Sequence, residues 1–320
     1  MNNTWKSYLQ LSMAMFFAGS TVVAGKLIVN KIPIFLSQGI SLFFALIVII
    51  PLACFKEGSI FKCKIKKMDL FWLFMQGLTG IFMFRIFILL GLKYTSAIES
   101  GIITSTTPAL LAVFSFLFLK EKLDKVTVSG IGLCVFGIIV INTSNLNGAI
   151  QSTFLSIIGN SFILIAVIGE VLFTIFRKKQ SFSNRPLTST SYVILFSFIL
   201  FLPIALYEMK KFDLSQLSFL SYLPMIYYGV FCSAIGYTCW FSGIAKVPVS
   251  VAAGFSGVMP ISSVALSTAI LNERLTWQHI IGIAMTIIGI YIISFRRRFG
   301  KCSIKKTPNN SSAPLNQQVE

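Results

Sequence analysis

The chain has 320 residues, of which 55% are hydrophobic and only 12% are charged, and its mean hydropathy is +0.82. Soluble domains average about 45–50% apolar and about 25% charged residues, so a soluble globular protein is excluded. A disordered chain is excluded as well, because this much apolar surface would collapse in water. The net charge of +17 would suggest a nucleic-acid partner if the protein were soluble.

Long runs without Asp, Glu, Lys or Arg separate clusters of charge, for example at 32–55, 100–119 and 186–207. A transmembrane helix takes about 20 apolar residues, and these runs are long enough. They show no alternation of polar and apolar residues, so they are predicted to be helices and not strands of a barrel. We predict an all-α polytopic membrane protein with ten spans, at about 8–30, 32–55, 69–91, 96–119, 126–142, 153–176, 187–207, 219–243, 248–271 and 277–295.

The basic residues are distributed unequally between the predicted loops. With the N-terminus in the cytosol, 20 Lys and Arg side chains lie in cytosolic segments and 6 lie outside. This excess predicts that both the N-terminus and the C-terminus are cytoplasmic. The positive charge is then a topology signal, and no nucleic-acid partner is expected. The polar segment 297–320 is expected to be a disordered cytosolic tail.

The two halves of the chain align without a gap at an offset of 152 residues, with 91–142 lying over 243–294. The matched residues that have a backbone or charge reason to recur are Gly77/Gly229, Gly91/Gly243, Pro108/Pro260, Glu121/Glu273, Gly130/Gly282 and Gly137/Gly289. Each half holds five predicted spans, so the second half crosses the membrane in the opposite direction. Such inverted repeats build secondary transporters with a substrate site near the midplane. The repeat needs its first span, which argues against a cleaved signal peptide ending near Ala24.

The repeated unit contains a recognisable motif in each half. The first copy reads Tyr94-Thr95-Ser96-Ala97, Pro108 and Lys120-Glu121-Lys122-Leu123, and the second reads Val247-Pro248-Val249, Pro260 and Asn272-Glu273-Arg274-Leu275. This pattern resembles the EamA-type ten-helix transporters of the drug/metabolite transporter superfamily, over two five-helix repeats at 8–143 and 153–296. The resemblance implies a carrier that exports or exchanges small metabolites, often amino acids, without ATP. It also implies that helices three, four, eight and nine line the cavity, with one and six in front.

Charged residues at membrane depth are the first candidates for a substrate site. Arg85 lies within the third span, where an arginine costs roughly 2.5–3.5 kcal/mol unless it faces a partner or water. It either binds a substrate carboxylate or phosphate or forms a structural ion pair, for which Glu99 is the candidate partner. Glu170 is alone in the sixth span and suits a proton carrier or a contact to a cationic substrate. The alternative is that it reaches the basic cluster at 177–179 or pairs with another helix.

Proline and aromatic positions complete the predicted substrate-binding cavity. Thr106 beside Pro108, and Pro260 in the second repeat, predict interrupted helices whose polar groups face a cavity. Tyr237 and Trp240 lie one turn apart and either stack on a substrate or belong to the core. The cavity is thus assigned to Arg85, Glu99, Glu170, Thr106, Pro108, Tyr237, Trp240 and Pro260.

Two further groups of residues are given structural roles. Glu121 and Glu273 are interpreted as caps or ion pairs at helix ends in preference to gates. The Gly130/Gly137 and Gly282/Gly289 pairs predict close packing of the fifth and tenth spans on neighbours or on a second subunit.

The predicted function is a secondary transporter, an exporter or exchanger of small metabolites such as amino acids, working by alternating access. An uptake carrier for a nucleotide-like or cofactor-like metabolite is one alternative. A membrane-embedded enzyme or a non-transporting scaffold is another, but the sequence shows no catalytic constellation or metal spacing and no phosphate-binding loop. No cofactor and no metal are expected. The expected partners are a small metabolite and the lipid bilayer, with the chain a monomer or a homodimer.

Overall fold

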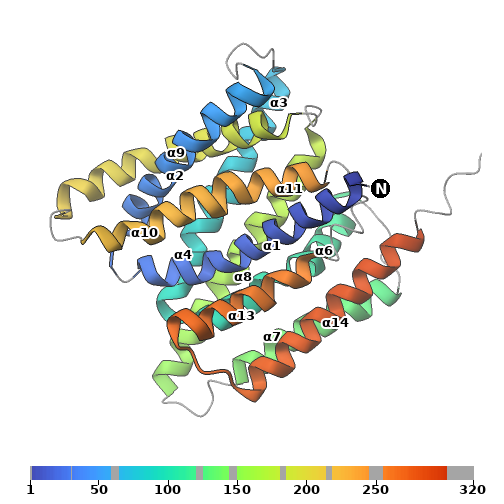
Figure 1. Ribbon diagram of the computed structural model, residues 1–320. Helices are drawn as coiled ribbons and strands as arrows, with labels where there is room; N and C mark the ends of the chain where they lie inside the picture. The colour runs from blue at the N-terminus through green and yellow to red at the C-terminus, as the bar shows by residue number, and fades with distance from the viewer. Residues whose placement is uncertain are drawn as a thin grey trace, which may run out of the picture.

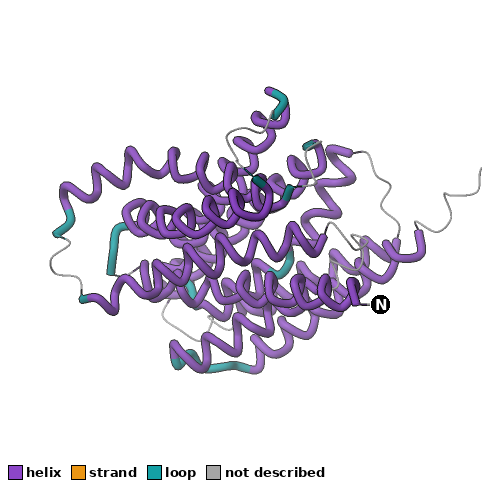
Figure 2. Tube along the Cα trace, turned by 45° about the horizontal axis from the view of Figure 1, so that its top comes forward, coloured by secondary structure: helices purple, strands orange, loops and turns teal. Residues whose placement is uncertain are grey.

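The computed structural model describes residues 2–29, 31–58, 65–119, 125–143, 150–180, 185–213, 218–244 and 255–300. Within these ranges every regular element is a helix (Figure 2). The elements are α1 (Asn2–Val29), α2 (Ile34–Glu57), α3 (Lys67–Gln76), η2 (Gly77–Met83), α4 (Phe84–Tyr94), α5 (Ala97–Thr104), α6 (Thr107–Leu119), α7 (Lys125–Thr143), α8 (Ile150–Lys179), α9 (Pro186–Lys211), α10 (Phe219–Tyr227), η5 (Tyr228–Ile235), α11 (Gly236–Ile244), η6 (Phe255–Gly257), α13 (Val258–Leu271) and α14 (Trp277–Gly300). Because α14 continues to Gly300, the first residues of the predicted tail are helical. Residues 301–320 lie outside the described part of the chain.

The predicted all-α polytopic membrane fold is confirmed. Seven described helical segments are long and apolar enough to cross a membrane, and three shorter apolar helices at Val128–Gly137, Val258–Leu271 and Trp277–Ile292 occupy the remaining predicted positions. Many large apolar side chains on the outside of these helices are exposed, such as Phe136, Ile139, Ile281 and Ile288. A soluble protein rarely exposes so many together, and a lipid-facing surface accounts for them.

The internal repeat is visible in the helix boundaries. The composite helix α3–η2–α4 occupies 67–94, and α10–η5–α11 occupies 219–244, which is the same stretch displaced by 152 residues. Both contain a π-helical segment at the equivalent place, η2 in the first repeat and η5 in the second. Such segments are rare and occur frequently at functional sites, because the extra residue per turn reorients the side chains that follow.

Helices of the two repeats pack across each other and not only within their own half. Helix α1 packs on α11 and α13 of the second repeat, while its counterpart α8 packs on α4 and α6 of the first. Equivalent helices also pair with each other, as α2 with α9 and α7 with α14. These two pairs lie on opposite sides of the helix array in Figure 1, with α1, α4, α8 and α11 between them.

The glycines matched by the repeat lie where helices approach most closely. A Cβ atom on Gly77 would come within 3.0 Å of the Val193 carbonyl oxygen on α9, and one on Gly229 would overlap the equivalent Ser41 carbonyl on α2. A Cβ on Gly137 would lie 3.0 Å from the Gly282 carbonyl oxygen, so the glycine pairs pack α7 against α14 within one chain. The predicted close packing of the fifth and tenth spans is confirmed.

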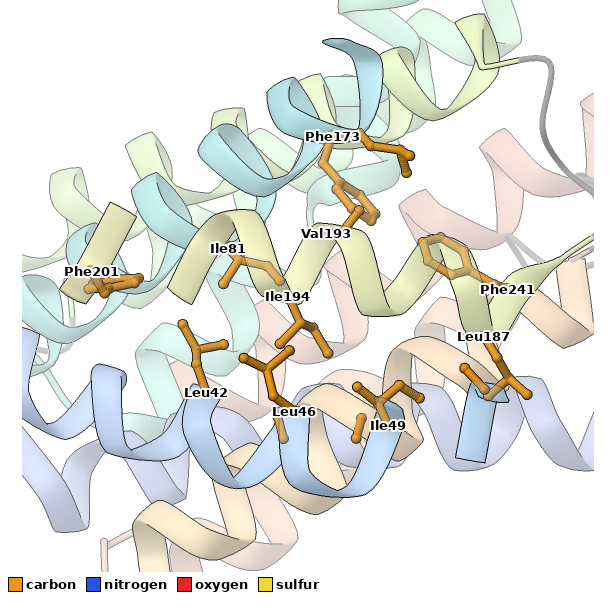
Figure 3. Close-up of a cluster of buried hydrophobic side chains, with 14 residues drawn as sticks. Leu42, Leu46, Ile49, Ile81, Phe173, Leu187, Val193, Ile194, Phe201 and Phe241 are labelled. Atoms are coloured by element: carbon orange, nitrogen blue, oxygen red, sulfur yellow. The ribbon is translucent and has the colours of Figure 1, made fainter. Parts of the chain in front are cut away.

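The largest apolar cluster lies where the two repeats meet. It joins side chains of α2, α9, η2, α8 and α11, including Leu42, Ile81, Phe173, Phe201 and Phe241 (Figure 3). Phe173 and Phe241 lie 6.0 Å apart between ring centroids in a stacked arrangement. This cluster fixes η2 and α11 against each other, and these two elements carry or flank the candidate site.

Pro108 and Pro260 each lie in the first turn of a helix and not in the middle of one. Residues 105 and 106 form a turn between α5 and α6, and Pro108 then lies in the first turn of α6. Pro260 likewise lies in the first turn of α13, directly after the 3-10 turn η6. Proline is tolerated there because the first backbone N–H groups of a helix have no partner within that helix.

Candidate substrate site

Arg85 is buried at the interface of the two repeats, with 2% of its surface exposed. It lies on α4 directly after the π-helical segment η2. Its Nη1 donates a hydrogen bond to Oε1 of Gln38 on α2 at 2.8 Å, and its Nη2 donates to the hydroxyl of Ser233 in η5. Its guanidinium carbon lies 4.5 Å from the ring centroid of Tyr228. The arginine therefore connects η5 of the second repeat to α2 and α4 of the first.

The π-helical segment η5 shapes the partner side of this contact. The Ser233 hydroxyl donates to the carbonyl of Tyr228, five residues earlier, at 2.8 Å. The wider turn lets the Ser233 hydroxyl and the Tyr228 ring both contact the guanidinium group of Arg85. Gln38 keeps its Nε2 buried without a hydrogen-bond partner, so the site has an unused donor beside a cation.

All three groups that the structure places on Arg85 are neutral. The expected ion pair with Glu99 is not formed, because no described carboxylate lies within ion-pair distance of Arg85. Glu99 instead contacts Thr95, Asn160 and His279. Arg85 is in the first turn of α4, whereas Glu99 follows the end of that helix, so the two charged groups lie at different levels along the bundle. A buried guanidinium with neutral partners keeps its full charge, which suits binding of an anionic group.

Glu170 lies on α8 and contacts the α5–α6 break. Its Oε2 accepts a hydrogen bond from the Thr107 hydroxyl at 2.8 Å. The neighbouring Thr106 is 2% exposed and uses its hydroxyl on the Ile103 carbonyl at 2.7 Å, so it caps the end of α5. The expected pairing of Glu170 with the basic cluster is not seen for Arg177, which donates to Gln180 at 2.5 Å and lies over the Phe241 ring.

Two predicted aromatic site residues lie on α11 and pack on the apolar cluster between the repeats. Tyr237 on α11 packs 5.7 Å from Phe173 between ring centroids, and its hydroxyl donates to the Gly80 carbonyl at 3.3 Å. Both Arg85 and Glu170 are within electrostatic range of that hydroxyl. Trp240, one turn further along, is half-buried and packs on the same apolar cluster. Tyr237 is thus the residue that lies near both charged groups, and Trp240 shares its apolar cluster.

The remaining predicted site residues lie elsewhere or only partly within description. Pro260 is buried at the start of α13 and contributes to packing, since Gly19 of α1 closely approaches the same turn. The side chain of Pro108 and the whole of Glu121 lie outside the described residues. Glu273 accepts hydrogen bonds from the backbone N–H groups of Ala97 and Ile98, both at 2.9 Å, so its predicted capping role is confirmed.

Comparison with known proteins now adds to this geometry. The model of the EamA-like transporter family matches residues 5–143 and 157–295. The chain belongs to the EamA-like transporter family. It is 41% identical over 293 residues to the uncharacterized transporter YetK of Bacillus subtilis (strain 168), covering 91% of this chain and 88% of that protein.

More distant similarities extend this result. The chain is 26% identical over 205 residues to a probable amino-acid metabolite efflux pump of Escherichia coli (strain K12), covering 60% of this chain and 64% of that protein. A solved crystal structure superposes with a TM-score of 0.64 at 17% identity, over 91% of this chain and 98% of that one. That likeness shows the fold alone.

Sequence reasoning missed several polar partners in this EamA-like transporter. Gln38 and Asn160 carried a usable signal, because a lone amide inside an apolar span is expensive and needs a partner. Ser233 and Tyr228 carried none, since serine and tyrosine are common in membrane helices. His279 is only 6% exposed, and its Nε2 lies 4.0 Å from Oε1 of Glu99. No group of three or more His, Cys, Asp or Glu residues in the described ranges could hold a metal ion.

Proposed function

We propose that this EamA-like transporter exports or exchanges small zwitterionic metabolites such as amino acids by alternating access. The observation that carries the proposal is Arg85, a buried cation at the interface of the repeats whose described hydrogen-bond partners are neutral. A substrate carboxylate supplies the missing negative charge and accepts from two guanidinium N–H groups.

Glu170 is the complementary group for the ammonium end of a zwitterionic substrate. Glu170 presents a carboxyl group on α8, and among the described residues its side chain is hydrogen-bonded to the Thr107 hydroxyl. The aromatic rings of Tyr237 and Trp240 on α11 provide a surface that suits an apolar side chain. The relative named as a probable amino-acid metabolite efflux pump points to the same chemical class.

Alternating access follows from the repeat. Because α1 packs on the second repeat and α8 packs equivalently on the first, the two halves have two related ways to close around the centre. The excess of basic residues in alternate loops supports a plasma-membrane protein with both termini in the cytoplasm. A non-enzymatic role is part of the same proposal.

A counterflow assay in proteoliposomes tests the substrate class. Vesicles loaded with a panel of unlabelled amino acids are placed in trace labelled amino acid, and accumulation above that of protein-free vesicles reports transport. The competitors are a matched set: the amino acid, its carboxamide and its decarboxylated amine. We expect the amino acid to compete at least tenfold better than either derivative, which corresponds to about 1.4 kcal/mol. Equal competition by all three would refute binding through the carboxylate.

The same proteoliposomes separate the remaining alternatives. Accumulation of nucleotides or cofactors in place of amino acids would favour the uptake-carrier alternative. If no compound of the panel accumulates, although the protein is folded and inserted, the transporter proposal is wrong at the level of its substrate class.

A further inference from the structure

A second polar cluster lies away from Arg85, at the end of the bundle where α1 and α4 end and α5 and α14 begin. We call it the distal cluster, and its members are Thr95, Glu99, Asn160 and His279. Their exposed fractions are 4%, 4%, 5% and 6%, so all four side chains are buried. They come from the α4–α5 junction, α8 and α14, so the cluster joins both repeats.

The hydrogen atoms in this cluster can be counted. Oε2 of Glu99 lies 2.9 Å from the Thr95 hydroxyl and 2.9 Å from the Asn160 amide nitrogen. The Thr95 hydroxyl also lies 2.6 Å from the Asn160 amide oxygen. These three contacts form a closed triangle. The Asn160 amide supplies one hydrogen and the Thr95 hydroxyl supplies one, so one contact lacks a hydrogen if Glu99 is ionised.

Reversing the Asn160 amide does not change this count. In that orientation the amide nitrogen donates to Thr95, Thr95 donates to Glu99, and the amide oxygen then faces Glu99 without a hydrogen. In either orientation all three contacts become hydrogen bonds only when Glu99 carries a proton. The triangle thus has a place for one proton.

His279 provides the neighbouring titratable group. Its Nδ1 accepts a hydrogen bond from the backbone N–H of Thr276 at 3.3 Å, so the neutral ring carries its hydrogen on Nε2. That Nε2 is buried without a hydrogen-bond partner and lies 4.0 Å from Oε1 of Glu99. The ring is therefore held close to the carboxyl group and is not bonded to it.

Two more charged groups face the cluster. Lys26 at the end of α1 donates to the carbonyls of Leu92 and Thr95, at 2.7 and 2.6 Å, and is within electrostatic range of Glu99. Glu273, which follows α13, caps α5 and is within electrostatic range of both Lys26 and His279. Lys26 stabilises the carboxylate once the proton has left, so both protonation states of Glu99 have support.

We propose that Glu99 is a reversible proton-binding site whose occupancy favours closure of the distal end and so couples transport to protons. The proton binds a carboxylate oxygen of Glu99 and completes the hydrogen bonds between the α4–α5 junction and α8. Its release to water leaves a carboxylate beside Lys26 and His279, and one contact of the triangle loses its hydrogen. This inference rests on the proposed transport function for the coupling, but the proton site itself can be measured without any substrate.

The substrate-free test uses infrared difference spectra of the purified full chain between acid and alkaline pH. We expect a carbonyl-stretching band of a protonated carboxyl group that disappears in Glu99→Gln. The matched control is Glu208→Gln, which alters a carboxylate that caps α2 at the same end of the bundle and lies outside the distal cluster. Because His279 is the chain's one histidine, ¹³C-labelled histidine gives one assignable NMR signal, and Glu99→Gln should remove the step that follows Glu99 titration.

A second variant covers the case in which Glu99→Gln does not fold. Thr95→Val removes the hydroxyl of the triangle and keeps the carboxyl group. We expect it to change the pH midpoint of the infrared band by about one unit, the equivalent of one hydrogen bond. An infrared band that is identical in wild type, Glu99→Gln and Thr95→Val would overturn the proton site.

The coupling is tested by imposing pH gradients of opposite sign on proteoliposomes. We expect the transport rates of the wild type in the two gradients to differ by about fivefold or more, and those of Glu99→Gln to be equal. A Glu99→Gln variant that transports and keeps the wild-type ratio would overturn the coupling. If the wild type transports nothing but the Glu99 band is present, the proposed function fails and the proton site is supported.

Discussion

Arg85 in the first repeat and Tyr237 in the second repeat occupy equivalent positions, 152 residues apart, and each follows a π-helical segment. The backbones agree, but one position carries a permanent charge and the other an aromatic ring. The same holds for Ser233, whose counterpart in the first repeat is the apolar Ile81. The polar groups at the interface of the repeats are therefore unlike residues on a repeated backbone.

The contacts that hold the helices together are, in contrast, reciprocal. Glu57 at the end of α2 accepts hydrogen bonds from backbone N–H groups of Leu187 and Thr188 at the start of α9, at 3.0 and 2.9 Å. Glu208 near the end of α9 accepts from the N–H of Leu36 at the start of α2, at 2.7 Å. A symmetric framework has two equivalent ways to open, and in the function proposed above the asymmetric polar groups select the substrate and the coupling ion.

The largest expected effect comes from removing the charge that distinguishes the repeats. Arg85→Gln should lower the apparent affinity for amino acid by about 100-fold, since a desolvated charge pair with its hydrogen bonds contributes about 2–5 kcal/mol. Concentration dependence of counterflow measures it. Lys93→Gln is the control, because it makes the same chemical change at an exposed site on the same helix. Equal effects of both variants would show that Arg85 acts through net charge and not through contact.

The glycine contacts test the symmetric side of the comparison. Gly137→Val and Gly289→Val should each destabilise the protein by roughly 1–3 kcal/mol, because a Cβ on either meets the facing backbone of α14 or α7. Thermal unfolding in detergent measures the effect. Gly132→Val on α7 is the control, since a Cβ there meets nothing within 4 Å. A large difference between the two variants would mean that the α7–α14 contact is not reciprocal.

These contacts also show what the sequence could predict. The glycines that recur at the 152-residue offset mark helix contacts. Close approach of two helices leaves no space for a side chain at these positions in either repeat. The candidate pairing of Arg85 with Glu99 is not formed, because Arg85 is in the first turn of α4 and Glu99 lies beyond the end of that helix. The π-helical segment η2 lies just before Arg85 and orients the side chains that follow it, and the residue pattern did not predict this segment.

The partners of the charged residues were harder to foresee for a related reason. Gln38 reaches Arg85 from α2, and Asn160 reaches Glu99 from α8, so each contact depends on helices brought together by the fold. An amide in an apolar span indicates a buried polar contact but does not name its partner. Family resemblance supplied the architecture, and only the folded structure supplied these pairs.

The reciprocal helix caps provide a third test with a smaller effect. Glu57→Gln and Glu208→Gln each replace a charged acceptor at a helix N-terminus by a neutral one, which should lower stability by about 0.3–1 kcal/mol. Unfolding midpoints in detergent measure the change. The two losses should be similar if the α2–α9 contact is symmetric. Glu57 also accepts a hydrogen bond from the Thr188 hydroxyl at 2.8 Å. A loss of stability confined to Glu57→Gln would mean that this additional bond matters more than the backbone caps.

The smallest expected effect concerns Tyr237, the residue that occupies the position of Arg85 in the second repeat. Tyr237→Phe removes a hydroxyl whose described hydrogen bond to Gly80 is long, at 3.3 Å, and keeps the ring that packs on Phe173. Counterflow affinity should therefore change by about threefold or less, which is within the range of a weak neutral hydrogen bond. Tyr237→Leu removes the ring. It should reduce affinity further, because the contact between the aromatic ring and an apolar side chain of the substrate is lost. If Tyr237→Phe instead matched Arg85→Gln, the hydroxyl would have to bind substrate directly, and the second repeat would contribute as much polar recognition as the first.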